Sequence, residues 1–158
     1  MSQAEIIIFT ASITLLGGSI LYIIQRWLEN FFWNPIVKQK ETIEDIATAL
    51  MNYANIYGNP SVALPNYAAG GPLKEKVEET INRLRELASL LRVRTDNIKA
   101  YQFFVDIHLV SVSKKDINEA FHLLVSLSNL VIDTNTDSAR NVAIADLIRK
   151  HLKLPNPN

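Results

Sequence analysis

The chain has 158 residues, which is enough for one modest domain with a short segment outside it. Its 16 basic residues balance its 16 acidic residues, so no overall electric field draws the chain toward nucleic acid or acidic lipid. The chain has no cysteine, which excludes disulfides and thiolate metal sites and fits a reducing compartment.

The N-terminal segment has the pattern of a membrane-spanning helix. Residues 6–24 contain no charge, and at about 1.5 Å per residue such a helix matches a hydrocarbon core of about 30 Å. Near its end stand Tyr22, Trp27 and Trp33, whose rings are of the kind enriched at headgroup level. A cleaved signal peptide is disfavoured, because Glu5 precedes the apolar run and no small-residue cleavage site follows it.

The positive charges beside the span predict its orientation. No Lys or Arg precedes it, whereas Arg26, Lys38 and Lys40 follow it closely. Because positively charged flanks stay in the cytoplasm, we expect a single-pass protein of the inner (cell) membrane with its N-terminus outside. Residues 1–33 are then the anchor with its interfacial belt, and residues 34–158 are a cytoplasmic helical domain.

Small residues recur within the span. Thr10, Thr14 and Gly18 are spaced by four, and Gly17 stands beside the last of them. Such a stripe lets two membrane helices approach closely, so it predicts a homo-oligomer that packs through this face. The alternative is that these residues are ordinary members of a helix that faces lipid.

The first helix after the span follows Pro35, which either starts or kinks a helix. Its apolar residues repeat with a heptad-like spacing and are Ile36, Ile43, Ala47, Leu50, Ala54 and Tyr57. This stripe predicts a helix that packs in a bundle or against copies of itself, and that ends at Gly58-Asn59-Pro60. We expect residues 58–72, rich in Gly and Pro, to form the one long loop.

Further helical patterns follow this loop. They cover residues 73–94, a short stretch around Tyr101, a segment that starts with a capping-box spacing at residues 113–116, and residues 137–153. The residues expected in the core are Val77, Ile81, Leu84, Ala88, Leu91, Tyr101, Phe103, Phe104, Ile117, Phe121, Leu124, Ser128, Val131, Ile144, Leu147, Ile148 and Leu152. Because no period-two alternation appears, the predicted fold is all-α, with one N-terminal transmembrane helix and a cytoplasmic bundle of about four helices.

Four arginines flank the apolar stripe of the 73–94 helix. At about 100° per residue, Arg85 and Arg92 lie on one side of it, and Arg83 and Arg94 lie on the other. Either they extend along a packed face, or they bind a ligand, because paired guanidiniums suit bidentate phosphate contacts. In a symmetric oligomer each pair would repeat as a ring, and a cyclic nucleotide has phosphates arranged to match it.

No pattern of catalytic or metal-binding residues stands out. His108, His122 and His151 lack the spacing of a metal site, and Ser126 and Ser128 lie outside any G-x-S-x-G motif. The chain is therefore not expected to be an enzyme, or to hold a cofactor or a metal.

Three blocks of sequence carry a resemblance: "QRWLENFFWNPIVKQKETIEDIATALMNYANIY", "LRELASLLRVRTDNIKAYQFF" and "EAFHLLVSLSN". Together they resemble a bacterial family of small single-span membrane proteins with a cytoplasmic helical domain. The likeness rests on the aromatic-Pro junction and on the LR-x-LA-x-LLR and LSN blocks. It implies the topology given above, and it transfers no catalytic residue to this chain.

Two functions fit these features. The first is a membrane-tethered helical scaffold that self-associates in the lipid bilayer and recruits a cytoplasmic protein partner. The second is a ligand-gated effector of antiphage defence, CRISPR-associated or similar, whose cytoplasmic domain binds a cyclic oligonucleotide and perturbs the membrane. This second function requires an anion site and a stiff link to the span.

Overall fold

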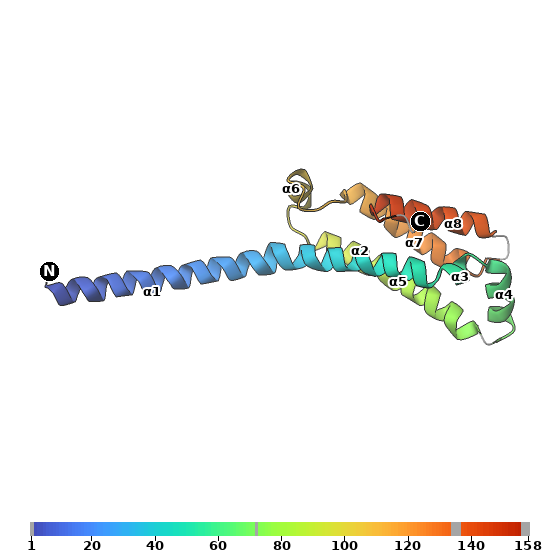
Figure 1. Cartoon of the computed structure of the whole chain (residues 1–158), viewed down its shortest axis with the longest axis horizontal. Coiled ribbons are helices and arrows are strands. Elements are labelled where there is room, and N and C mark those ends of the chain that lie inside the picture. The colour runs from blue at the N-terminus through green and yellow to red at the C-terminus, as the bar shows by residue number, and fades with distance from the viewer. Residues whose placement is uncertain (1, 72, 134–136, 156–158) are drawn as a thin grey trace.

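The computed structural model describes residues 2–71, 73–133 and 137–155, and all regular structure in these ranges is helical. Figure 1 shows a long helical rod that projects from a group of shorter helices. The prediction of an all-α chain is confirmed for the residues described.

The rod begins with α1 (Gln3–Leu28), an apolar helix with no buried side chain. Ser2 caps it, because its hydroxyl accepts the Glu5 N–H while the Glu5 carboxylate accepts the Ser2 N–H at 2.7 Å. By length and composition, α1 is long and apolar enough to cross a membrane.

A π-helical turn, η1 (Glu29–Trp33), joins α1 to α2 (Asn34–Asn52). Pro35 explains this wide turn, since Pro has no N–H and its ring clashes with the carbonyl four residues earlier. The Asn34 N–H reaches the Glu29 carbonyl, five residues back. Pro35 therefore does not interrupt the rod, and helical backbone runs without a break from Gln3 to Asn52.

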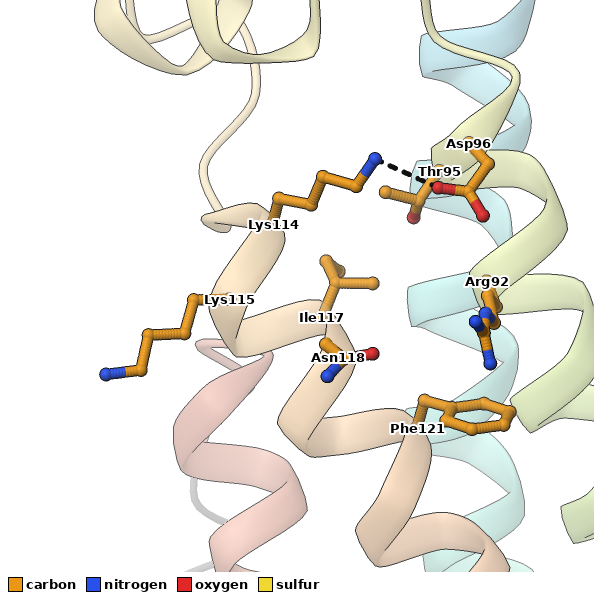
Figure 2. A pocket seen from close by; sticks show the side chains of 8 residues that line it. All are labelled: Arg92, Thr95, Asp96, Lys114, Lys115, Ile117, Asn118 and Phe121. Atoms are coloured by element: carbon orange, nitrogen blue, oxygen red, sulfur yellow. Dashed lines mark ion pairs between the residues drawn. The ribbon is translucent and has the colours of Figure 1, made fainter.

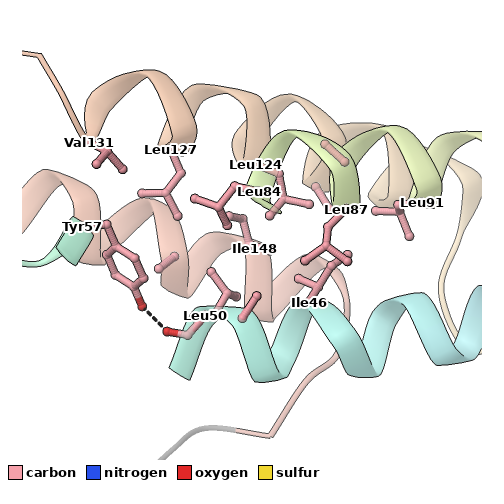
Figure 3. Packing of buried hydrophobic residues seen from close by; sticks show 14 of the residues in the cluster. Ile46, Leu50, Tyr57, Leu84, Leu87, Leu91, Leu124, Leu127, Val131 and Ile148 are labelled. Atoms are coloured by element: carbon pink, nitrogen blue, oxygen red, sulfur yellow. Dashed lines mark hydrogen bonds between the residues drawn. The ribbon is translucent and has the colours of Figure 1, made fainter. Parts of the chain in front are cut away.

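The main core lies where α5 (Lys74–Asp96) packs against α2 on one side and against α7 (Lys114–Leu130) on the other, with α8 (Ser138–His151) packed on α7. In Figure 3, Leu87 of α5 lies beside Ile46 of α2, and its Leu84 lies beside Leu124 of α7. The predicted α5 stripe is confirmed as buried; its members are Val77, Ile81, Leu84, Ala88 and Leu91. Burial of this stripe on two sides makes α5 the central helix of the domain.

The helix predicted to run as far as Tyr57 is interrupted before its end, and the segment 58–72, predicted as a loop, contains a short helix. α3 (Ala54–Tyr57) follows a backbone kink at Tyr53, and α4 (Pro60–Ala68) begins directly after Asn59. The loop prediction is wrong because Pro60 takes the first helical position, where its fixed φ and missing N–H are favourable.

Polar bonds fasten α3 to α8 at the far end of the domain. The Asn141 side-chain amide donates to the Tyr57 carbonyl at 2.7 Å, and the Ser138 hydroxyl donates to the Gly58 carbonyl. The Tyr57 hydroxyl in turn donates to the Leu50 carbonyl at 2.6 Å. These bonds satisfy carbonyls that the ends of α2 and α3 leave without helical partners.

A second, smaller core surrounds α6 (Tyr101–Asp106). Its buried members are Ile36, Ile98, Tyr101, Phe104 and Val110, with Phe32 packed against them. The prediction that Phe103 is buried was wrong, because a helix of six residues turns only one side toward the domain and leaves Phe103 57% exposed. On α8 the same prediction was wrong for Leu147, which is 43% exposed, and on α7 Phe121 is only half-buried.

A buried polar network joins the two cores. The Gln39 amide donates to the Thr95 hydroxyl at 2.7 Å and to the Tyr101 hydroxyl at 3.0 Å. Tyr101 donates in turn to the Val112 carbonyl at 2.8 Å. Burial raises the pKa of Tyr101, so this hydroxyl stays protonated and able to donate at neutral pH. The network fixes α6 against both α2 and α5.

Candidate functional site

A cleft of about 420 Å³ opens between the C-terminal half of α5 and the N-terminal half of α7 (Figure 2). It is the candidate functional site because it combines cationic, polar and aromatic side chains. The residues that line it are Arg92, Thr95, Asp96, Lys114, Lys115, Ile117, Asn118 and Phe121.

The charges of the cleft favour an anion. Lys114 crosses it to pair with Asp96 at 3.0 Å, and these two charges offset one another. Arg92 has no carboxylate partner among the described residues; its guanidinium lies over the Phe121 ring, 5.1 Å from the ring centre. Lys115 lies at the outer edge and points away from Arg92 (Figure 2). The cleft therefore carries a net positive charge.

The wall formed by α7 is held in place at its N-terminus. The Ser113 hydroxyl caps the helix by accepting a hydrogen bond from the Asp116 N–H, which confirms the predicted cap. The same hydroxyl donates to the Asp116 carboxylate at 2.6 Å, whereas in a full capping box this carboxylate would accept from the Ser113 backbone N–H. The other carboxylate oxygen lies 2.9 Å from His151 Nδ1 of α8.

These contacts affect the charge of Asp116. The Ser113 bond first, and the His151 bond second, hold the pKa of Asp116 below its ordinary value of 3.8. A carboxyl whose pKa is lowered by folding stabilises the fold above that ordinary value, and this contribution is lost as the pH falls through the lowered pKa. Asp116 is therefore charged at neutral pH, next to the cleft.

The four predicted arginines divide between two neighbours of α5. Arg85 donates to the Asn129 side chain at 2.8 Å and to Ser128 at 3.3 Å, so it bridges α5 to α7, as Arg92 does through Phe121. Arg83 pairs with Glu86 at 2.9 Å and lies 3.5 Å from Asp45 of α2. Of the four arginines, only Arg92 lines the α5–α7 cleft.

Arg94 belongs to a second, smaller cleft at the end of the domain nearest α1. Its guanidinium donates to the Lys38 carbonyl and the Thr42 hydroxyl, both at 2.7 Å. This cleft of about 270 Å³ contains no acidic residue in its lining, which consists of Asn30, Asn34, Pro35, Lys38, Arg94 and Asn97. This second cleft could therefore accommodate an anionic group close to the point where η1 joins α1 to α2.

Ser128 and His122 make contacts of a structural kind. Ser128 donates to the Val125 carbonyl at 2.7 Å, and His122 packs edge-on against Phe121. In the described part of the chain, no three His, Asp or Glu side chains gather as a metal site requires. The α5–α7 cleft needs Lys114 and Phe121 as well as Arg92, and no pattern in the sequence indicates that these residues of α7 face α5.

No protein family model, curated protein or solved structure matches this chain. The resemblance to the bacterial single-span family therefore remains a prediction from short blocks of sequence.

Proposed function

We propose that the chain is a non-catalytic binding module held at the inner membrane by a single span, with its helical domain in the cytoplasm. The observation that carries this proposal is α1, whose apolar side chains are all unburied. An apolar surface of this length is unfavourable in water and favourable in a bilayer.

The polar groups of α1 support a lipid environment. The hydroxyls of Ser12, Thr14 and Ser19 each donate to the carbonyl four residues earlier, at 2.8–2.9 Å. A hydroxyl bonded within its own helix needs no water. Arg26 pairs with Glu29 at 3.0 Å just beyond the apolar run, where both charges would meet headgroups.

The topology gives a direct test. With a tag at the C-terminus, protease added to spheroplasts is expected to leave the tag intact, because the Lys and Arg residues after the span favour the cytoplasmic side. A periplasmic marker protein should be digested in the same sample. Digestion of the tag in intact spheroplasts would reverse the proposed orientation.

Self-association through α1 is part of this proposal. A side chain added at Gly18 would meet no atom within 4 Å in a single copy of the chain. Gly18→Ile should therefore leave the monomer undisturbed but push two packed helices apart, weakening association by roughly 1–2 kcal/mol.

The measurement is cross-linking of the full chain in vesicles, with Leu16→Ile as a control about 200° around the helix from Gly18. Equal oligomer yields for wild type, Gly18→Ile and Leu16→Ile would show that Thr10, Thr14, Gly17 and Gly18 face lipid.

A second candidate function, the ligand-gated effector, is favoured by one observation: Arg92, which has no carboxylate partner in the described part of the chain, lies over Phe121 in a positive cleft. A guanidinium suits a phosphate, and an aromatic ring suits a nucleobase. The unbroken backbone from α1 to α2 supplies the stiff connection by which a ligand on the domain would act on the span.

Calorimetric titration of the full chain with cyclic di-, tri- and tetranucleotides tests this function. Arg92→Ala should weaken binding by about 10- to 100-fold, the loss typical of a hydrogen bond to a charged group. Arg83→Ala, on the α2 side of the same helix, is the matched control and should change the affinity little. No binding across the panel, or equal losses in both variants, would leave the tethered module as the function.

A further inference from the structure

We propose that α6 and the turn that follows it form a second membrane-contacting element, which lies on the bilayer surface beside the end of α1 and inserts Phe103, Ile107 and Leu109 at headgroup level. This inference rests on the proposed function, since it takes α1 to span the bilayer.

The apolar exposure around α6 is unusual within this domain. Phe103 is 57% exposed, Ile107 52% and Leu109 43%, all within seven residues. In the rest of the described domain from Asn34 onward, the large exposed apolar side chains are spaced further apart along the chain: Val37, Met51, Val93, Val142 and Leu147. A cluster of this kind is unfavourable in water and marks a contact surface.

A chain of aromatic rings places this cluster next to the end of α1. The ring of Phe104 lies 5.7 Å from that of Phe32 in η1, and Phe32 lies 5.4 Å from Trp27. Phe103 extends the series, 5.5 Å from Phe104. Figure 1 shows α6 at the end of the domain from which α1 projects.

The height of α6 along the rod agrees with the thickness of the headgroup layer. Phe32 is five residues beyond Trp27, or about 7.5 Å along the helix axis. The interfacial layer on each side of a bilayer is roughly 5–8 Å thick. With Trp27 at the edge of the hydrocarbon core, the ring contacts keep α6 within that layer.

The backbone holds the exposed side chains in place. Ala100 and His108 both have left-handed φ values, 54° and 60°, and turn the chain at the two ends of α6. The N–H groups of Leu109 and Val110 both donate to the Phe104 carbonyl, at 2.9 and 3.1 Å. The apolar cluster is thus displayed by a fixed loop that the second core anchors through Phe104.

The charges at this end of the domain suit a bilayer that contains anionic lipid. The exposed Lys99 precedes α6, and the acid-free cleft of Lys38 and Arg94 opens at the same end. The one carboxylate on α6, that of Asp106, accepts a hydrogen bond from Gln102 at 2.8 Å. Basic residues near the surface add to binding by inserted apolar side chains.

A lipid surface explains the cluster better than a protein partner does. A stable protein interface buries about 800 Å² on each partner, which three side chains do not supply. Insertion into lipid needs no such area, because each apolar side chain that leaves water contributes its own favourable free energy of transfer. The continuity of the rings with the end of α1 also specifies the bilayer as the neighbouring surface.

The absence of cysteine makes a clean experiment possible. A single spin label is attached to the full chain at Phe103→Cys or Ile107→Cys, in vesicles of phosphatidylcholine and phosphatidylglycerol. Collision rates with oxygen, which concentrates in lipid, and with a water-soluble nickel chelate report the surroundings of each label. Met51→Cys, 58% exposed on α2, is the matched control in water, and Leu16→Cys, 65% exposed on α1, is the control in lipid.

The labels at 103 and 107 should collide with the nickel chelate several-fold less often than the label at 51, and with oxygen more often. Both variants remove exposed side chains, so their circular dichroism should equal that of the wild type. Labels at 103 and 107 that match position 51, while position 16 reports lipid, would overturn the inference and leave the anchor intact. A water-accessible label at position 16 would overturn the anchor, and the inference with it.

Discussion

Replacing both Ile13 and Leu16 with arginine is expected to move most of the chain out of the membrane fraction. Both side chains lie near the middle of the apolar run and are more than half exposed on α1. An arginine at the centre of a membrane helix costs about 2.5–3.5 kcal/mol on the insertion scale, so the pair shifts the equilibrium by roughly 5–7 kcal/mol. The measurement is the fraction of the chain that resists alkaline carbonate extraction.

The matched control places two arginines at Val142 and Leu147 of α8, each 43% exposed. These positions lie outside the proposed span, so the extracted fraction should equal that of the wild type. If the Ile13→Arg/Leu16→Arg chain also resists extraction fully, α1 is held at the membrane by something other than its own apolar surface.

Leu87→Ala should be the most destabilising single truncation in the helical domain. Leu87 is fully buried on α5, the helix that packs against both α2 and α7. Shortening a buried leucine loses its transfer free energy and leaves a cavity, at a cost of about 2–5 kcal/mol. Urea unfolding of the full chain in detergent, followed by far-ultraviolet circular dichroism, measures the change in the free energy of unfolding.

Val93→Ala, 56% exposed on the same helix, is the control and should change that free energy by no more than about 0.5 kcal/mol. Similar losses in the two variants would mean that the helix itself, and not its packing between α2 and α7, determines the stability.

The sequence predicted the periodic parts of this structure well. The α5 stripe repeats with the helical period over the whole helix, and the Ser113 cap depends on residues only three apart, so both patterns can be seen directly in the sequence. Phe103 shows the limit of this approach, because an aromatic residue in a very short helix has no periodic context to tell its buried side from its exposed side. Pro60 shows another limit, since proline marks a loop and the start of a helix equally well.

The α5–α7 cleft was beyond prediction from one sequence. Arg92 was a candidate through its position on α5, but Lys114 and Phe121 join it only because two helices pack in one particular register. Side-chain volumes along both helices decide that register, and no spacing within a single segment encodes it. The second core around Phe104 likewise depends on Phe32, more than seventy residues earlier in the chain.

The π turn at Glu29–Trp33 sets the angular phase between the proposed span and the domain. A turn closed over five residues takes about one more residue than an α turn, so α2 is rotated by roughly 100° relative to an uninterrupted α-helix. The side of α1 that lies directly along the rod from the α5-facing side of α2 is therefore not the side expected for a continuous α-helix at about 100° per residue. Removing one residue from η1 would restore an α turn without turning the domain, whereas removing one residue from within α1 would turn the apolar span by roughly 100° about the rod relative to the domain.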